Sequence, residues 1–208
     1  MEEAAEPVPT STGGITRRTA LKAFGTAAVL PWLSDEGLLA FTRIQETNAP
    51  PAPRILSAPQ LRTLETLVEA IIPADDRSPG AKQARVAEYI DLWLSESDRH
   101  VVLEWTGGLA SLDAEAATRF RAPFVRLTAA QLDAILADIS RNERDPKTPL
   151  ETFFVMAKQA TVIGYYTSKI GIHDELHYKG NVFLREFVGC QTEDGKDCPH
   201  CGQKHSQV

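Results

Sequence analysis

The chain has 208 residues, a formal net charge of −6 and a hydrophobic content of 43%. This length and hydrophobic content fit one folded domain with tails and argue against disorder throughout. The acidic balance argues against a nucleic-acid-binding protein, which normally presents a basic face. No apolar run reaches the roughly 20 residues that a membrane-spanning helix needs, so a permanent span is not expected.

An export signal is indicated near the N-terminus. Arg17 and Arg18 precede a short, mildly apolar stretch rich in small residues, 23–30. Paired arginines before such a stretch are typical of the twin-arginine export route, although a surface arginine pair beside an amphipathic helix is the alternative. We therefore expect residues 1–45 to be a signal region, disordered or cleaved, with Leu38–Ala40 as a candidate cleavage point. The protein is then expected in the periplasm.

The folded domain is predicted to follow a proline-rich linker at 46–56, because this stretch cannot hold a helix. Structure is expected to begin at Ser57. Three helix starts share a hydroxyl side chain followed three residues later by glutamine or glutamate, which is the capping-box pattern: Ser57 with Gln60, Thr128 with Gln131, and Thr148 with Glu151. Apolar residues at helical spacing follow each start.

Two further helices are predicted between the first and the second of these starts. One covers Val86–Leu94, and the other runs from about 99 to 118, where Gly107 and Gly108 weaken the prediction. The helix that starts at Thr148 is long and mostly apolar, which indicates a central position covered on more than one side.

The predicted fold class is all-α, because no alternating apolar pattern of a β-strand appears at any length. A single helical-bundle domain is expected at 57–170. An irregular C-terminal arm, interrupted by glycines, is expected at 171–208.

Two pairs of side chains have the residue types of catalytic or metal-binding groups. Asp75 and Asp76 could act as acid–base carboxylates, but the neighbouring prolines and glycine favour a role in a turn. His173 and His177 stand four residues apart, as metal ligands on one helical face would. The glycines on either side of this pair argue against a helix there.

The C-terminal tail holds the three cysteines of the chain, Cys190, Cys198 and Cys201. Together with His205 they have the spacing of a Cys₃His zinc site, and Cys198 and Cys201 alone have that of a thiol redox pair. A disulfide is favoured over zinc because exported proteins lie in an oxidising compartment. The odd number leaves one thiol without a partner in the chain.

Several strings of the sequence resemble the gluconate 2-dehydrogenase subunit 3 family. The longest and most specific is Ala70–Ala81, and the others are Val86–Asp91, Gly164–Ser168, Tyr178–Asn181 and Phe187–Cys190. The resemblance implies a non-catalytic small subunit that carries the export signal of its complex and helps a larger subunit to fold or to hold FAD. It assigns no catalytic or cofactor-binding residue to this chain.

The same resemblance implies the partners. They are a large FAD-binding dehydrogenase of the glucose-methanol-choline type, which oxidises a sugar, polyol or sugar acid, a multihaem cytochrome c, and the twin-arginine translocase. Membrane association would then come through the complex, and Cys190 is placed where an intersubunit disulfide is a reasonable expectation. The alternative function is that of a metal-binding or thiol-redox protein acting through Cys198, Cys201 and their neighbours.

Overall fold

The computed structural model describes residues 33–47, 52–178 and 180. The chain divides into two units, residues 1–177 and 178–208, and every helix described lies in the first. Within the described residues the structure contains helices and no strands, as the all-α prediction requires. No helix among these residues has the length and apolar character needed to cross a membrane.

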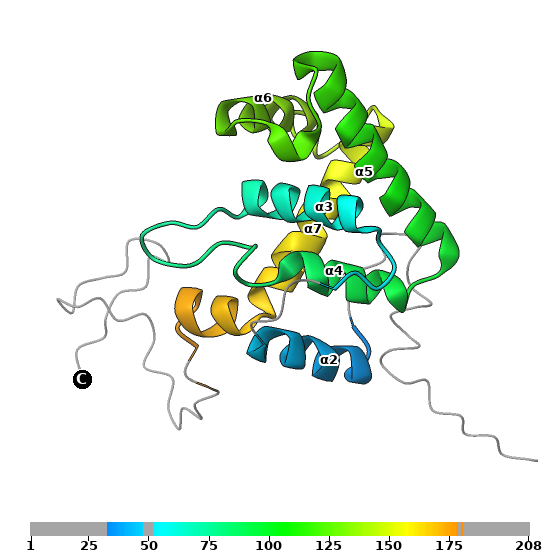
Figure 1. The fold of residues 1–208 in the computed structure, drawn as a ribbon. Helices are drawn as coiled ribbons and strands as arrows, with labels where there is room; N and C mark the ends of the chain where they lie inside the picture. Colours follow the sequence, from blue (N-terminus) through cyan, green and yellow to red (C-terminus); the bar gives the residue numbers. More distant parts are fainter. Residues whose placement is uncertain (1–32, 48–51, 179, 181–208) are drawn as a thin grey trace, which may run out of the picture. The chain divides into compact units, whose positions relative to one another are not determined.

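Six α-helices and two short helices make up the described part of the first unit (Figure 1). The α-helices are α2 (Asp35–Glu46), α3 (Ala58–Ile71), α4 (Val86–Ser95), α5 (Arg99–Phe120), α6 (Ala129–Ile139) and α7 (Pro149–Tyr166). The short ones are η1, a 3₁₀ helix at Phe124–Arg126, and η2, a π-helix at Gly171–Glu175.

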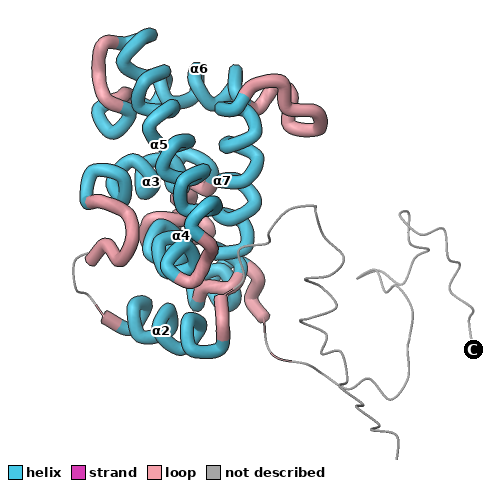
Figure 2. The backbone as a smooth tube through the Cα atoms, turned by 90° about the vertical axis from the view of Figure 1, so that its right-hand side faces the viewer, coloured by secondary structure: helices cyan, strands magenta, loops and turns pink. Residues whose placement is uncertain are grey.

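Helix α7 is central, as its apolar sequence predicts. It packs against α3, α4, α5 and α6, and Figure 2 shows it running along the other helices from α6 towards α2. The three predicted capping boxes are all formed in both directions, at Ser57, Thr128 and Thr148. These caps satisfy backbone N–H groups that a helix start otherwise leaves without partners, and they fix where α3, α6 and α7 begin.

Aromatic side chains join the helices in the core. The Trp105 ring stands edge-on to those of Trp93 and Phe153, with ring centres 5.8 and 5.6 Å apart. All three side chains are buried. These contacts hold α4, α5 and α7 together, and edge-to-face pairs of this kind add about 0.5–1.5 kcal/mol each beyond area burial.

A buried carboxylate fixes the approach to α3. Asp91, on α4 and 2% exposed, accepts hydrogen bonds from the backbone N–H groups of Arg54, Ile55 and Leu56 at 2.6, 3.1 and 2.8 Å. The end of the predicted linker is therefore attached to the core, even though its prolines keep it from forming a helix.

The prediction that structure begins at Ser57 is wrong. Residues 35–46, assigned to the signal region and the start of the linker, form α2, which packs against α4. The physical reason is a narrow apolar stripe, with Gly37 and Phe41 buried and Ile44 partly buried. Helical structure also extends past residue 170. The π-helix η2 lies within the region that was predicted to be an irregular arm.

Candidate functional site

The loop between α3 and α4, which holds all but the first two residues of the string Ala70–Ala81, is an ordered turn rather than an acid–base site. Asp75 accepts hydrogen bonds from the backbone N–H groups of Arg77 and Ser78 at 2.8 and 2.9 Å. The N–H of Ser78, then that of Arg77, lowers the pKa of the Asp75 carboxyl. An ionised carboxylate held in this way stabilises a turn and is a poor proton donor. Asp76 is exposed.

Glu69, near the end of α3, holds both sides of this loop. Its carboxylate accepts hydrogen bonds from the backbone N–H groups of Ala74 and Lys82 at 3.3 and 2.8 Å. A Cβ at Gly80 would lie 2.5 Å from a Glu69 oxygen and 2.6 Å from the Ala74 nitrogen. Only glycine fits at position 80, because the two ends of the loop approach each other so closely there.

Tyr165 connects the loop to the central helix. Its hydroxyl donates to the Pro79 carbonyl at 2.7 Å and lies 3.1 Å from the Ser78 hydroxyl. Burial raises the pKa of Tyr165, so the phenol keeps its proton and remains a donor. Glu69 on α3 and Tyr165 on α7 thus fix the loop from the side of the core, while residues 73–77 face solvent. A rigid, exposed, polar surface suits recognition of another molecule.

Replacing Tyr165 by phenylalanine is expected to loosen this loop without unfolding the protein. The ring would stay in place, but the Pro79 carbonyl and the Ser78 hydroxyl would lose a partner, at about 1 kcal/mol. Hydrogen exchange at the Ala81 amide, which donates to Ile72, should become about fivefold faster. Tyr166→Phe is the matched control, because that neighbouring side chain is 39% exposed. Equal exchange in the two variants would contradict the role of Tyr165.

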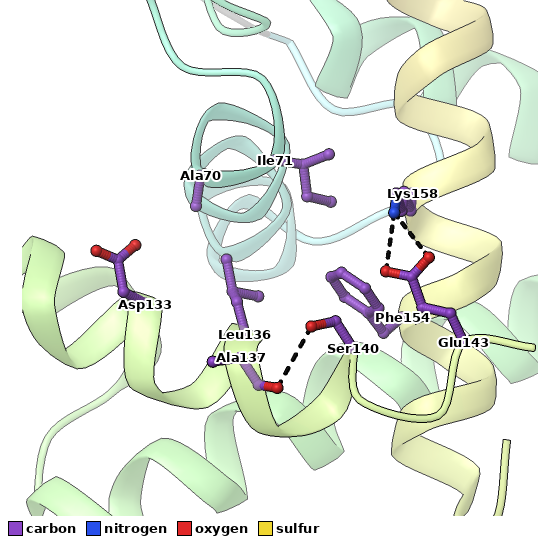
Figure 3. A pocket seen from close by; sticks show the side chains of 9 residues that line it. All are labelled: Ala70, Ile71, Asp133, Leu136, Ala137, Ser140, Glu143, Phe154 and Lys158. Atoms are coloured by element: carbon purple, nitrogen blue, oxygen red, sulfur yellow. Dashed lines mark hydrogen bonds and ion pairs between the residues drawn. The ribbon is translucent and has the colours of Figure 1, made fainter.

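A shallow hollow of about 340 Å³ lies between α3, α6 and α7 (Figure 3). Two of its charged groups compensate each other, because the Lys158 ammonium contacts both oxygens of Glu143 at 2.8 and 2.7 Å. The Ser140 hydroxyl donates to the carbonyl of Ala137, as Figure 3 shows, instead of to a base that would activate it. The other lining residues are Ala70, Ile71, Asp133, Leu136 and Phe154.

Glu88 is a buried carboxyl with a structural partner. Burial raises its pKa, while the Arg85 guanidinium, with its Nε 2.6 Å from a Glu88 oxygen, acts in the opposite direction. A raised carboxyl pKa is typical of catalytic acids, but it also occurs in buried ion pairs. The contact with Arg85 at the start of α4 favours the second explanation.

The two histidines of the possible metal pair lie on and after η2. Both are exposed, and the His177 Nδ1 lies 3.3 Å from the His173 carbonyl oxygen, so this nitrogen is the donor. Among the described residues, no group of three or more histidine, cysteine, aspartate or glutamate side chains is placed to hold a metal ion. The other predicted site residues lie outside the described part of the chain: Arg17, Arg18, Cys190, Cys198, Cys201 and His205.

The roles of Glu69, Asp91 and the Tyr165 hydroxyl in the fold are not visible in the local sequence pattern. Their partners are 5 to 87 residues away along the chain and mostly backbone groups. A lone carboxylate gives no local pattern that would reveal such partners. The ring of Tyr165 is buried in the core.

The comparison with known proteins identifies the family. The family model for gluconate 2-dehydrogenase subunit 3 matches residues 58–182, from the start of α3 to beyond η2. No curated protein and no solved structure matches the chain. The family match covers more than half of the chain and includes the loop between α3 and α4, so the chain belongs to the gluconate 2-dehydrogenase subunit 3 family.

Proposed function

We propose that this protein is the non-catalytic small subunit of a periplasmic, FAD-dependent sugar or sugar-acid dehydrogenase, and that it acts as export escort and stabiliser. Its partner is a large subunit of the glucose-methanol-choline type, which binds FAD and performs the oxidation. A multihaem cytochrome c is a further partner, and the translocase recognises Arg17 and Arg18. The large FAD-binding subunit and the small subunit cross the membrane together in the folded state.

The observation that carries this proposal is the family match over the folded unit. The family name describes one subunit of a dehydrogenase complex, and this supports an accessory role for the chain. Two described carboxylates have features of catalytic groups, and both support it further, because Asp75 is engaged in a turn and Glu88 in an ion pair. Cofactor insertion before export is the usual reason for a folded-state route, and FAD in the partner would supply that reason.

Replacing both Arg17 and Arg18 by lysine should stop export of the whole complex. The charge is kept, but the paired guanidinium groups that the translocase recognises are lost. We expect the flavoprotein to stay in the cytoplasm together with this chain, with its flavin absorbance and dehydrogenase activity intact. The measurement is dehydrogenase activity and flavin content in periplasmic and cytoplasmic fractions of cells that express both subunits.

The matched control is the double variant Arg62→Lys and Arg126→Lys, which changes two exposed arginines of the folded unit in the same way. Periplasmic activity should be unchanged in this control. The proposal fails if the flavoprotein reaches the periplasm without paired arginines in this chain. It also fails if the isolated chain oxidises a sugar with an artificial electron acceptor.

A further inference from the structure

Helix α2 is attached to the rest of the folded unit at its N-cap residue. Ser34 caps the helix, with its hydroxyl accepting from the Gly37 N–H at 3.0 Å. The same residue binds Glu96, just after α4: its N–H and hydroxyl donate to the two carboxylate oxygens at 2.9 and 2.6 Å. A Cβ at position 37 would lie 2.5 Å from a Glu96 oxygen, so the glycine there permits this close approach.

The middle and the end of α2 are attached as well. Phe41 is 1% exposed and stands edge-on to the ring of Tyr89, with ring centres 5.0 Å apart. Burial raises the pKa of Tyr89 to about 12, while its hydrogen bonds with Thr167 and with the Leu33 backbone oppose the shift. The Gln45 side-chain oxygen accepts from the Lys169 N–H at 3.0 Å. The start of α2 is therefore held by Glu96, just after α4, its middle by Tyr89 on α4, and its end by Lys169, in the segment after α7.

Cutting the chain after Ala40, at the candidate cleavage point of the predicted export signal, would destroy this arrangement. It would remove the cap and residues 35–40 and leave only 41–46, which is too short to persist as a helix by itself. The new charged amino group would belong to Phe41, whose side chain is buried. The bond itself lies in the middle of a hydrogen-bonded helix, whereas proteases cleave extended chain at exposed tips and termini.

We infer that α2 is a permanent part of the mature protein, and that any peptidase that removes the export leader cuts at or before the bond between Leu33 and Ser34. The inference rests on the proposed function only for the existence of a leader. Residues 19–33 separate the arginine pair from α2, and such a length of chain reaches at most about 50 Å. The arginines can thus bind the translocase while α2 stays docked on the folded unit.

The first test uses the full chain purified from the cytoplasm, and it does not depend on export. Limited proteolysis followed by mass spectrometry should give a stable fragment that starts at or before Ser34. Phe41→Ala should lower Tm by about 10 °C and speed cleavage within α2 about tenfold. Leu39→Ala is the matched control, because this side chain on the same helix is 61% exposed, and its Tm should stay within about 2 °C of the wild type.

The second test is the intact mass of the chain in the complex purified from the periplasm. A first residue at or before Ser34, or an uncut chain, agrees with the inference. A periplasmic chain that starts between 35 and 57 overturns it, and so does a stable proteolytic fragment starting there with an unchanged Tm. Absence of the chain from the periplasm would instead overturn the proposed function, while the proteolysis and Phe41→Ala results would still decide the place of α2.

Discussion

Replacing Gly108 by alanine is expected to lower the free energy of unfolding by about 2 kcal/mol, although alanine is the better helix former. A Cβ at Gly108 would lie 2.1 Å from the nearest atom of the Phe153 ring. That ring is 2% exposed and packs edge-on against Trp105, so it has little room to move. The methyl group would separate α5 from α7, and this loss exceeds the gain of about 1 kcal/mol from helix propensity.

Gly107 provides the matched control for this experiment. A Cβ there would meet nothing within 4 Å, and the residue lies on the exposed face of α5. Gly107→Ala should therefore raise the free energy of unfolding by about 0.5–1 kcal/mol. Urea unfolding followed by circular dichroism measures both variants. Two changes of the same sign would contradict the packing of α5 on α7 that the structure shows.

These adjacent glycines illustrate what the sequence can and cannot predict. By helix propensity both glycines weaken the predicted helix from about 99 to 118 equally, whereas α5 runs without interruption from Arg99 to Phe120. The reason for a glycine at 108 lies outside the helix: it leaves room for the ring of Phe153, which is 45 residues away from Gly108 along the chain. Propensity is a local quantity, and tertiary packing overrode it here.

The starts of the helices were predictable because they are local. Each capping box is formed by two residues three apart, so Thr148 and Glu151 show it in the sequence as clearly as in the structure. The N-terminal boundary of the folded unit, at α2, was not predictable in this way. Helix α2 has its own cap, but its docking depends on Glu96 and Tyr89, which are 62 and 48 residues away from Ser34 and Phe41. Without those partners, α2 resembles the end of a leader.

In the candidate site, too, the local features were predictable and the contacts between distant residues were not. The sequence predicted that Asp75 belongs to a turn, and the structure confirms this through its bonds to Arg77 and Ser78. It did not predict that Tyr165 and Glu69 hold that turn, since both bonds connect distant parts of the chain. The roles of Arg17 and of the three cysteines stay predictions, because these residues lie outside the described part of the chain.

Replacing Asp91 by alanine is expected to lower the free energy of unfolding by about 3 kcal/mol, because three backbone N–H groups would lose a charged acceptor at once. The Leu56 N–H is the most affected, since it is buried with its side chain 3% exposed and water cannot easily replace the carboxylate. Asp91→Asn should lose about half as much, because one oxygen remains as an acceptor and the shape is kept.

Asp98→Ala is the matched control for these two variants. Asp98 precedes α5, is exposed and forms no capping hydrogen bond, so its loss should change the free energy of unfolding by no more than about 0.5 kcal/mol. Similar losses at 91 and 98 in urea unfolding would contradict the anchoring role of Asp91. Because Asp91 holds the segment between α2 and α3, its removal should also speed hydrogen exchange at the Arg54 and Ile55 amides more than in the core of α7.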